Sequence, residues 1–230
     1  MEFDRIYAEV DLGRIEENMK AMKEHLRPGT KMYGVVKTDA YGHGAVPVAR
    51  TIDRFVCGYA VATVDEGLKL RRHGIEKEIL SLGPVSAGRY QECLENDISL
   101  PVFEYRRAKE LSDAAVAEGK TAKIHIAVDT GMSRIGLFPD EGSVEIVKEI
   151  AELPALRIAG MFTHFARADE ADKTNAGEQY RRFREFCDDV KAAGVAVPVC
   201  HCSNSAGIVE LPDFNMDVVR AGITIYGMYP

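Results

Sequence analysis

Long apolar runs are missing from this sequence of 230 residues, and their absence limits what the protein can be. No stretch is long enough to span a bilayer, and residues 1–11 lack the apolar core of a secretion signal. An excess of positive charge is also lacking. The net charge is −7 and no stripe of lysine and arginine is present, which argues against a nucleic-acid partner. We therefore expect a globular, cytoplasmic protein with no membrane segment and no nucleic-acid partner.

Cysteine is sparse and shows no paired pattern. The five cysteines are Cys57, Cys93, Cys187, Cys200 and Cys202. An odd number of scattered cysteines without a targeting signal predicts free thiols in a reducing cytoplasm. The segment Cys200-His201-Cys202 offers metal-ligand side chains, but they are too few and too close in sequence to form a site alone. We expect no metal site.

Linkers, low-complexity tracts and internal repeats are absent as well, so apolar periodicity can be followed along the whole chain. Asp11 opens a helix with an apolar stripe, and Thr63 and Asn175 each precede a glutamate by the spacing of a helix capping box. A loop is predicted at Gly42 and Gly44, after the first strand. The predicted strands are residues 31–36, 57–62, 78–82, 98–103, 122–128, 156–162, 195–200 and 216–219.

Strands and helices alternate regularly within residues 1–230, and this pattern favours a single α/β domain, a (β/α)8 TIM barrel. No Gly-x-Gly-x-x-Gly turn follows the first strand, which weakens a dinucleotide-binding fold. In such a barrel the chemistry lies at the C-terminal ends of the strands. The polar residues expected there are Lys37, Tyr41, His43, Asp129, Thr130, Ser133, Arg134, Thr163, His164, His201, Ser203, Asn204, Ser205 and Arg220.

Lys37 stands where the first strand leaves the core, and a partly desolvated lysine is a usable amine nucleophile. The hydroxyls and small residues on the same rim suit an anion such as phosphate. Two enzyme classes combine these features: an aldolase whose lysine forms a Schiff base with a sugar phosphate, and an enzyme whose lysine binds pyridoxal phosphate. Structural interpretations also remain open. Lys37 could be a surface lysine and His164 a core histidine, while Arg134 and Arg220 could be ion-paired with Asp129 and Asp217.

The segment Val36-Lys37-Thr38-Asp39-Ala40-Tyr41-Gly42-His43-Gly44 closely resembles the cofactor-lysine signature of alanine racemases. Further motifs follow in that family's order: Asp129-Thr130-Gly131-Met132-Ser133-Arg134, Thr163-His164-Phe165, Asn204-Ser205-Ala206 and Arg220-Ala221-Gly222-Ile223. The resemblance implies a fold-type III barrel that binds pyridoxal 5′-phosphate. It also implies a racemase that interconverts L-alanine and D-alanine and supplies D-alanine for peptidoglycan.

By this resemblance, Lys37 would carry the cofactor and act as one of two bases. Arg220 would face the pyridine nitrogen with His164 beside it, and Arg134 would help to orient the substrate carboxylate. The implied catalytic residues are Lys37, Arg134, His164 and Arg220. Tyr41, Ser205 and the N–H groups of Gly222 and Ile223 would hold the phosphate. The implied cofactor-binding residues are Lys37, Tyr41, His164, Asn204, Ser205, Arg220, Gly222 and Ile223.

Two departures from the family pattern limit this expectation. The family's second base is a tyrosine of a following β-rich domain in the other subunit of a homodimer. This chain stops at Met228-Tyr229-Pro230, so we expect only the barrel domain, which alone should be almost inactive. Many members also have a lysine, often carbamylated, where this sequence has Ala127.

Two alternatives stay open. One is a racemase for serine or another amino acid on the same scaffold. The other is a non-catalytic, single-barrel protein that carries pyridoxal phosphate. Such carriers have about this chain length, but their lysine segment lacks the Asp-Ala-Tyr-Gly-His-Gly run that is present here.

Overall fold

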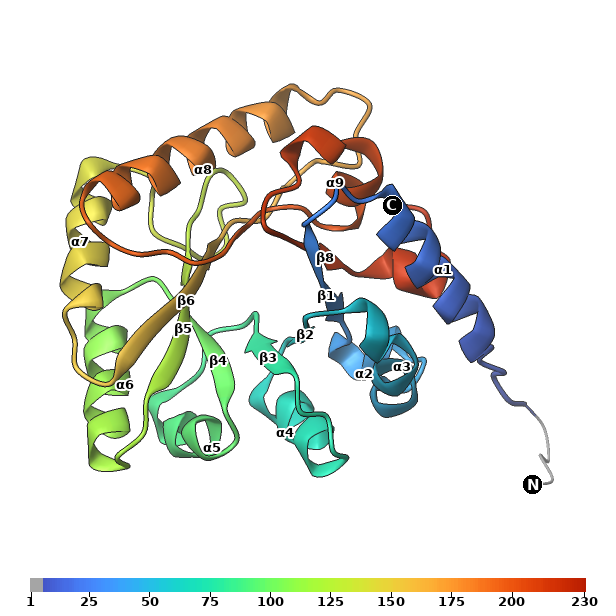
Figure 1. The fold of residues 1–230 in the computed structure, drawn as a ribbon, viewed down its shortest axis with the longest axis horizontal. Helices are drawn as coiled ribbons and strands as arrows, with labels where there is room; N and C mark the ends of the chain where they lie inside the picture. Colours follow the sequence, from blue (N-terminus) through green and yellow to red (C-terminus); the bar gives the residue numbers. More distant parts are fainter. Residues whose placement is uncertain (1–5) are drawn as a thin grey trace.

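The computed structural model describes residues 6–230, which form one barrel of parallel strands covered by helices (Figure 1). The strands are β1 (Lys31–Val35), β2 (Gly58–Val61), β3 (Glu78–Ser81), β4 (Ile98–Val102), β5 (Ala122–Ala127), β6 (Leu156–Phe162), β7 (Cys200–His201) and β8 (Val218–Ala221). Their order is β7-β6-β5-β4-β3-β2-β1-β8. The backbone N–H of Arg220 donates to the carbonyl of Ser203 at 3.0 Å, which brings β8 beside the end of β7. The predicted (β/α)8 barrel is confirmed.

Amphipathic helices cover the outside of the barrel (Figure 1). They are α1 (Leu12–His25), α3 (Ala45–Ile52), α4 (Val64–Arg72), α5 (Tyr90–Glu95), α6 (Tyr105–Ala117), α7 (Glu141–Ala151), α8 (Thr174–Ala192) and α9 (Ser205–Glu210). The segment labelled α2 (Lys37–Tyr41) is a left-handed turn rather than an α-helix. Their inward faces are apolar, and the side chains of Met19, Ile52, Leu70, Leu111 and Phe183 are fully buried. Within residues 6–230, no helix combines the length and the apolar character that a membrane crossing requires.

Two of the three helix starts that the sequence marks have the expected caps. Asp11 caps α1, and Thr63 begins α4 with a complete capping box. The capping box predicted at Asn175 is wrong, because α8 begins at Thr174. At this helix start Asp172 Oδ1 accepts from the backbone N–H of Thr174 at 2.9 Å. Asp172, rather than Asn175, therefore satisfies a backbone donor that the first turn of the helix leaves free.

The last two strands also differ from their predicted bounds. β7 is limited to Cys200–His201 instead of 195–200, because Pro198 has no N–H to donate to the ladder. β8 covers Val218–Ala221 instead of 216–219. Arg220 lies inside this strand, and a charged residue is atypical of a barrel strand, so the apolar pattern gave the wrong end.

Candidate active site

Lys37 lies two residues beyond the end of β1 and is followed by a left-handed turn where the sequence predicted a loop. The φ angles of Thr38, Asp39, Ala40 and Tyr41 are 54°, 51°, 55° and 53°. Each non-glycine residue in this conformation costs about 1–2 kcal/mol, so the turn must be held by its surroundings.

Helix α4 supplies much of that support. The backbone N–H of Thr38 donates to Glu66 Oε1 at 2.6 Å. Asp39 Oδ1 accepts from the backbone N–H of Ala45 at 2.9 Å and from Lys69 Nζ at 2.8 Å. The Ala45 bond and then the Lys69 bond lower the pKa of the Asp39 carboxyl. The sequence marked Glu66 only as part of a capping box, and no motif pointed to Lys69.

Aromatic rings fix the far end of the turn. The ring of Tyr41 lies 5.0 Å from that of Tyr226, and the ring of His43 stacks on Tyr226 at 4.8 Å. The Tyr226 hydroxyl donates to the carbonyl of Val35 at 2.8 Å. Lys37 Nζ lies 5.7 Å from the centre of the Tyr41 ring and has no hydrogen bond or ion pair within residues 6–230. Its half-buried amine therefore remains available for a ligand.

A small polar pocket, which we call the cradle, lies between this turn and the end of β8 and consists of the Tyr41 hydroxyl, Ser205 Oγ and the backbone N–H of Gly222. That N–H donates to Ser205 Oγ at 3.0 Å. A Cβ placed on Gly222 would lie 3.4 Å from both Ser205 Oγ and the Tyr41 hydroxyl, so glycine keeps the cradle open. Thr224 Oγ1, a further hydroxyl that the sequence did not single out, lies 3.1 Å from Ser205 Oγ. Asn204 caps α9 by accepting from the N–H of Gly207 at 3.0 Å.

The cradle belongs to a cavity of about 330 Å³. All eight predicted cofactor-binding residues line it: Lys37, Tyr41, His164, Asn204, Ser205, Arg220, Gly222 and Ile223. Arg134 lines an adjoining cavity of about 280 Å³, which shares Lys37, His164 and Arg220 with the first. The structure thus brings all nine predicted catalytic and cofactor-binding residues to these two adjoining cavities, whereas His201, which the sequence placed at the same rim, lies in the barrel interior.

Arg220 is buried and bonded to backbone rather than to an acid. Nη2 donates to the carbonyls of Thr163 and Cys202 at 2.8 and 2.9 Å, and Nη1 contacts His201 Nδ1 at 2.8 Å. Asp217 instead accepts from a backbone N–H, so the interpretation of Arg220 as a surface ion-pair partner is wrong. Burial lowers the pKa of Arg220 to about 10, which leaves it charged at neutral pH.

The neighbours of Arg220 make the cavity cationic. Burial, followed by the charges of Arg220, Arg134 and Lys37, lowers the pKa of His164 to about 3, so this ring is neutral. Arg134 is exposed and forms no ion pair with the described residues, because Asp129 Oδ1 accepts two backbone N–H groups of its own loop. The cavities are lined by the three remaining cations, Lys37, Arg134 and Arg220, and by the exposed Asp169, and this excess of positive charge predicts an anionic ligand.

Gln179 of α8 is a further residue that sequence reasoning missed. Its side chain is 1% exposed and donates to the carbonyl of His164 at 3.0 Å, while its oxygen accepts from the N–H of Ala166 at 2.8 Å. It also donates to Thr130 Oγ1 at 3.2 Å. Gln179 therefore fixes the backbone that carries His164, but a lone glutamine in a helix gives no signal of that role in the sequence.

The segment Cys200-His201-Cys202 does not converge on one point. His201 lies in the barrel interior, whereas Cys202 Sγ donates to the carbonyl of Phe214 at 3.1 Å. Across residues 6–230, no group of three or more His, Cys, Asp or Glu side chains is arranged to hold a metal ion.

The chain is similar to known proteins in sequence and in fold. A family model described as the alanine racemase N-terminal domain matches residues 10–230. Alanine racemase of Clostridium novyi is 45% identical over 98% of this chain and 58% of its own length, and that of Methanococcus maripaludis is 41% identical over 98% and 61%. The solved alanine racemase of Clostridium difficile has a TM-score of 0.94 and 39% identity, covering 95% of this chain and 58% of that chain.

This chain therefore spans less than two thirds of the length of the relatives it matches. The match nevertheless extends over the entire barrel, including the turn after Lys37, the cradle and Arg220. From the extent of this match and the fold that carries it, the chain belongs to the alanine racemase family.

Proposed function

We propose that this barrel binds pyridoxal 5′-phosphate and belongs to a protein that interconverts L-alanine and D-alanine. The observation that carries the proposal is the convergence of the Lys37 amine, the cradle and the buried Arg220 on one cavity. The donors fit the cofactor, since hydroxyls and a backbone N–H suit its phosphate and an arginine suits its ring nitrogen. The missing side chain of Gly222 supports the same fit, because a Cβ there would occupy space between Ser205 Oγ and the Tyr41 hydroxyl that the phosphate needs.

Each residue has a task that its position supports. Bound in the cavity, the cofactor supplies an electron sink that makes the Cα–H of an amino acid acidic. Lys37 would hold the cofactor through its amine, and the same amine is placed to move a proton at Cα on one face. Arg220 can only donate, so it holds the ring nitrogen as an acceptor. Arg134 is charged and unpaired within residues 6–230, and it binds the substrate carboxylate.

Racemisation also needs an acid or base on the opposite face of Cα. We propose that this group comes from a part of the relatives' length that the chain does not span. By this proposal residues 1–230 are the barrel domain, which binds the cofactor and turns over alanine very slowly. A homodimer remains the proposed assembly of the longer protein, on the family resemblance alone.

Alanine is the proposed substrate because the relatives carry that name, and D-alanine for peptidoglycan is the proposed product. Serine or another small amino acid is the alternative, which turnover of each amino acid by the longer protein would decide. The cytoplasm is the proposed location, supported by five cysteines that are all free. Ala127 stands where many family members have a carbamylated lysine, and it is buried at 1% exposure. Because alanine has no amine to modify, we propose that Arg134 has no carbamate from this position beside it.

Chemical trapping tests the central claim. The chain would be mixed with pyridoxal 5′-phosphate, reduced with borohydride, digested and analysed by mass spectrometry. We expect one modified peptide, carrying the cofactor on Lys37, and no trapping in Lys37→Ala. Lys20→Ala, which removes an exposed amine of α1, is the matched control and should trap normally. Equal labelling of many lysines, unchanged in Lys37→Ala, would refute the proposal.

A further inference from the structure

The barrel interior contains one continuous line of polar side chains. Glu78 of β3, His125 of β5, His201 of β7 and Arg220 of β8 contact one another in this order, and we call them the polar line. His125, His201 and Arg220 are 1%, 0% and 3% exposed. Branched apolar side chains usually fill this space in such barrels, so the polar line needs its own explanation.

The arginine end determines where every proton in the polar line lies. A guanidinium only donates, so His201 Nδ1, 2.8 Å from Arg220 Nη1, is an acceptor. The hydrogen of His201 is then on Nε2, which lies 3.0 Å from His125 Nδ1 and makes that atom an acceptor too. His125 therefore carries its hydrogen on Nε2, which lies 3.4 Å from Glu78 Oε1. Both rings are neutral Nε2–H tautomers.

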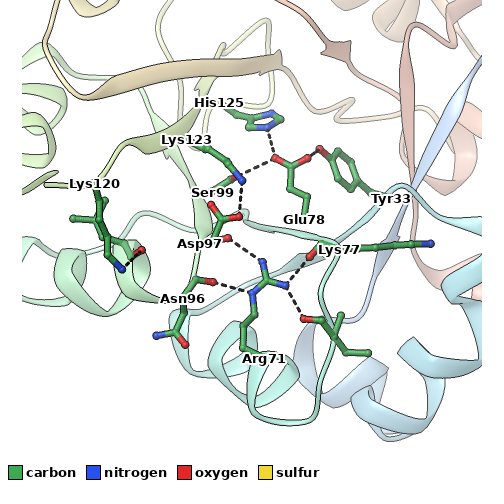
Figure 2. A network of polar contacts seen from close by, with 12 residues as sticks. Tyr33, Arg71, Lys77, Glu78, Asn96, Asp97, Ser99, Lys120, Lys123 and His125 are labelled. Carbon is green, nitrogen blue, oxygen red and sulfur yellow. Dashed lines mark hydrogen bonds and ion pairs between the residues drawn. The ribbon is translucent and has the colours of Figure 1, made fainter. Parts of the chain in front are cut away.

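The carboxylate end is consistent with the same direction. Figure 2 shows Glu78 between His125 and Tyr33, with Ser99 beside it. The Tyr33 hydroxyl donates to Oε2 at 2.6 Å and the Ser99 hydroxyl to Oε1 at 2.9 Å. Burial alone would raise the pKa of Glu78, but hydrogen bonds from His125, Tyr33 and Ser99 act in the opposite direction and lower it. An ionised carboxylate only accepts, so it requires the hydrogen of His125 on Nε2.

Two glycines leave room for this arrangement. A Cβ on Gly160 of β6 would lie 2.6 Å from His125 Nδ1, and a Cβ on Gly58 of β2 would lie 2.6 Å from the Tyr33 ring. Real Cβ atoms do not approach other atoms so closely, so a larger residue at either position would displace a ring. The backbone of two further strands is therefore fitted to the side chains around Glu78.

We infer that Glu78 is a positioning residue for Arg220, acting through His125 and His201 from the opposite end of the barrel. Its carboxylate fixes the tautomer of His125, and hence that of His201, so that His201 Nδ1 always faces the guanidinium as an acceptor. Arg220 is thereby held at the mouth of the barrel. The inference rests on the proposed function in one respect only, that Arg220 faces the ring nitrogen of the cofactor.

Nitrogen NMR of the full chain, labelled with ¹⁵N at histidine and measured without cofactor, tests the proton order directly. We expect His125 and His201 to be neutral, with hydrogen on Nε2 and none on Nδ1. A hydrogen on Nδ1 of either ring, or a doubly protonated His125, would overturn the inference. This measurement needs no substitution, so it does not depend on whether a variant folds.

Glu78→Gln then tests the carboxylate, with Glu76→Gln as the matched control because Glu76 is exposed and outside the polar line. A hydrogen bond to a charged acceptor is about twice as strong as one to a neutral acceptor, so exchange of the His125 and His201 ring hydrogens with water should accelerate about tenfold in Glu78→Gln only. Tyr33→Phe should instead slow it, because the carboxylate then has one donor fewer. Unchanged exchange in Glu78→Gln, or acceleration in Tyr33→Phe, would contradict the role of Glu78.

These results separate the two proposals. The expected tautomers together with failed trapping of the cofactor on Lys37 would leave the polar line intact and refute the proposed function. Successful trapping with the opposite tautomers would refute the inference alone.

Discussion

Glu66→Ala is expected to destabilise the chain by about 2–4 kcal/mol, because one carboxylate holds backbone donors of two elements. Oε1 accepts from the N–H of Thr38 at 2.6 Å, on the turn after Lys37. Oε2 accepts from the N–H groups of Ala62 and Thr63 at 2.7 and 3.2 Å, before α4. The substitution therefore releases the turn and uncaps the helix together.

The magnitude follows from these two parts. Loss of a helix cap costs about 0.5–2 kcal/mol. Loss of a hydrogen bond to a charged group costs about 1.5–3 kcal/mol, and the lower half applies to Thr38 because it is exposed and water can replace the acceptor. The left-handed backbone of residues 38–41 is less favourable than the right-handed backbone of helix α4, so the turn should loosen before the rest of the barrel.

Urea denaturation and amide hydrogen exchange check this prediction. Thr63→Ala is the matched control, since it removes the cap hydroxyl of the same helix and leaves the bond between Glu66 and Thr38. We expect the amides of residues 38–41 to exchange faster in Glu66→Ala than in Thr63→Ala, and trapping of the cofactor on Lys37 to fall with it. Equal destabilisation by both substitutions, with unchanged exchange in the turn, would show that α4 does not hold Lys37 in place.

Three further predictions concern the interior and the cradle. Gly222→Ala places a Cβ 3.4 Å from both Ser205 Oγ and the Tyr41 hydroxyl, so it should weaken binding of pyridoxal phosphate at least about tenfold in a titration. Gly88→Ala, in open space, should not. Arg220→Met should lower the free energy of unfolding by about 2–5 kcal/mol in urea, because buried carbonyls lose their donors; a smaller loss would mean that water replaces the guanidinium. The pKa of Glu78 is about 2 in the folded chain, below the ordinary 4.5, so its ionised form stabilises the fold above about pH 4.5 and this stabilisation is lost as the pH falls toward 2. The wild type should lose about 3 kcal/mol relative to Glu78→Gln across that window, and parallel pH profiles of the two proteins would contradict the depressed pKa.

The barrel and the rim could be predicted from the sequence because their signals are local. Strand and helix periods alternate, and each group of rim residues lies in a short segment directly after a strand, so strand order alone brings them to one end. The two errors in strand bounds have local causes as well. Pro198 interrupts an otherwise apolar stretch, and Arg220 lies inside a strand that the apolar pattern ended too early.

The supports of the site could not be predicted, because they depend on contacts between residues far apart in sequence. None of Thr38, Asp39, Ala40 and Tyr41 favours a left-handed conformation in isolation, so only Glu66 and the other contacts of the turn explain it. Glu78 and His125 are single polar residues in short strands, and nothing in their spacing indicates that they meet.

The polar line also shows why such long-range groups persist inside a barrel. Burying a histidine without partners, or an arginine without acceptors, would cost several kcal/mol, and replacing any one member leaves its neighbours unsatisfied. The line is favourable only when both ends are charged with opposite sign and both rings have the same tautomer, because then every buried donor faces an acceptor. Its members should therefore be energetically coupled. In a double-mutant cycle, removing Glu78 in a chain that already lacks the Arg220 guanidinium should cost less than removing it from the wild type, and strictly additive costs would show that the two ends act independently.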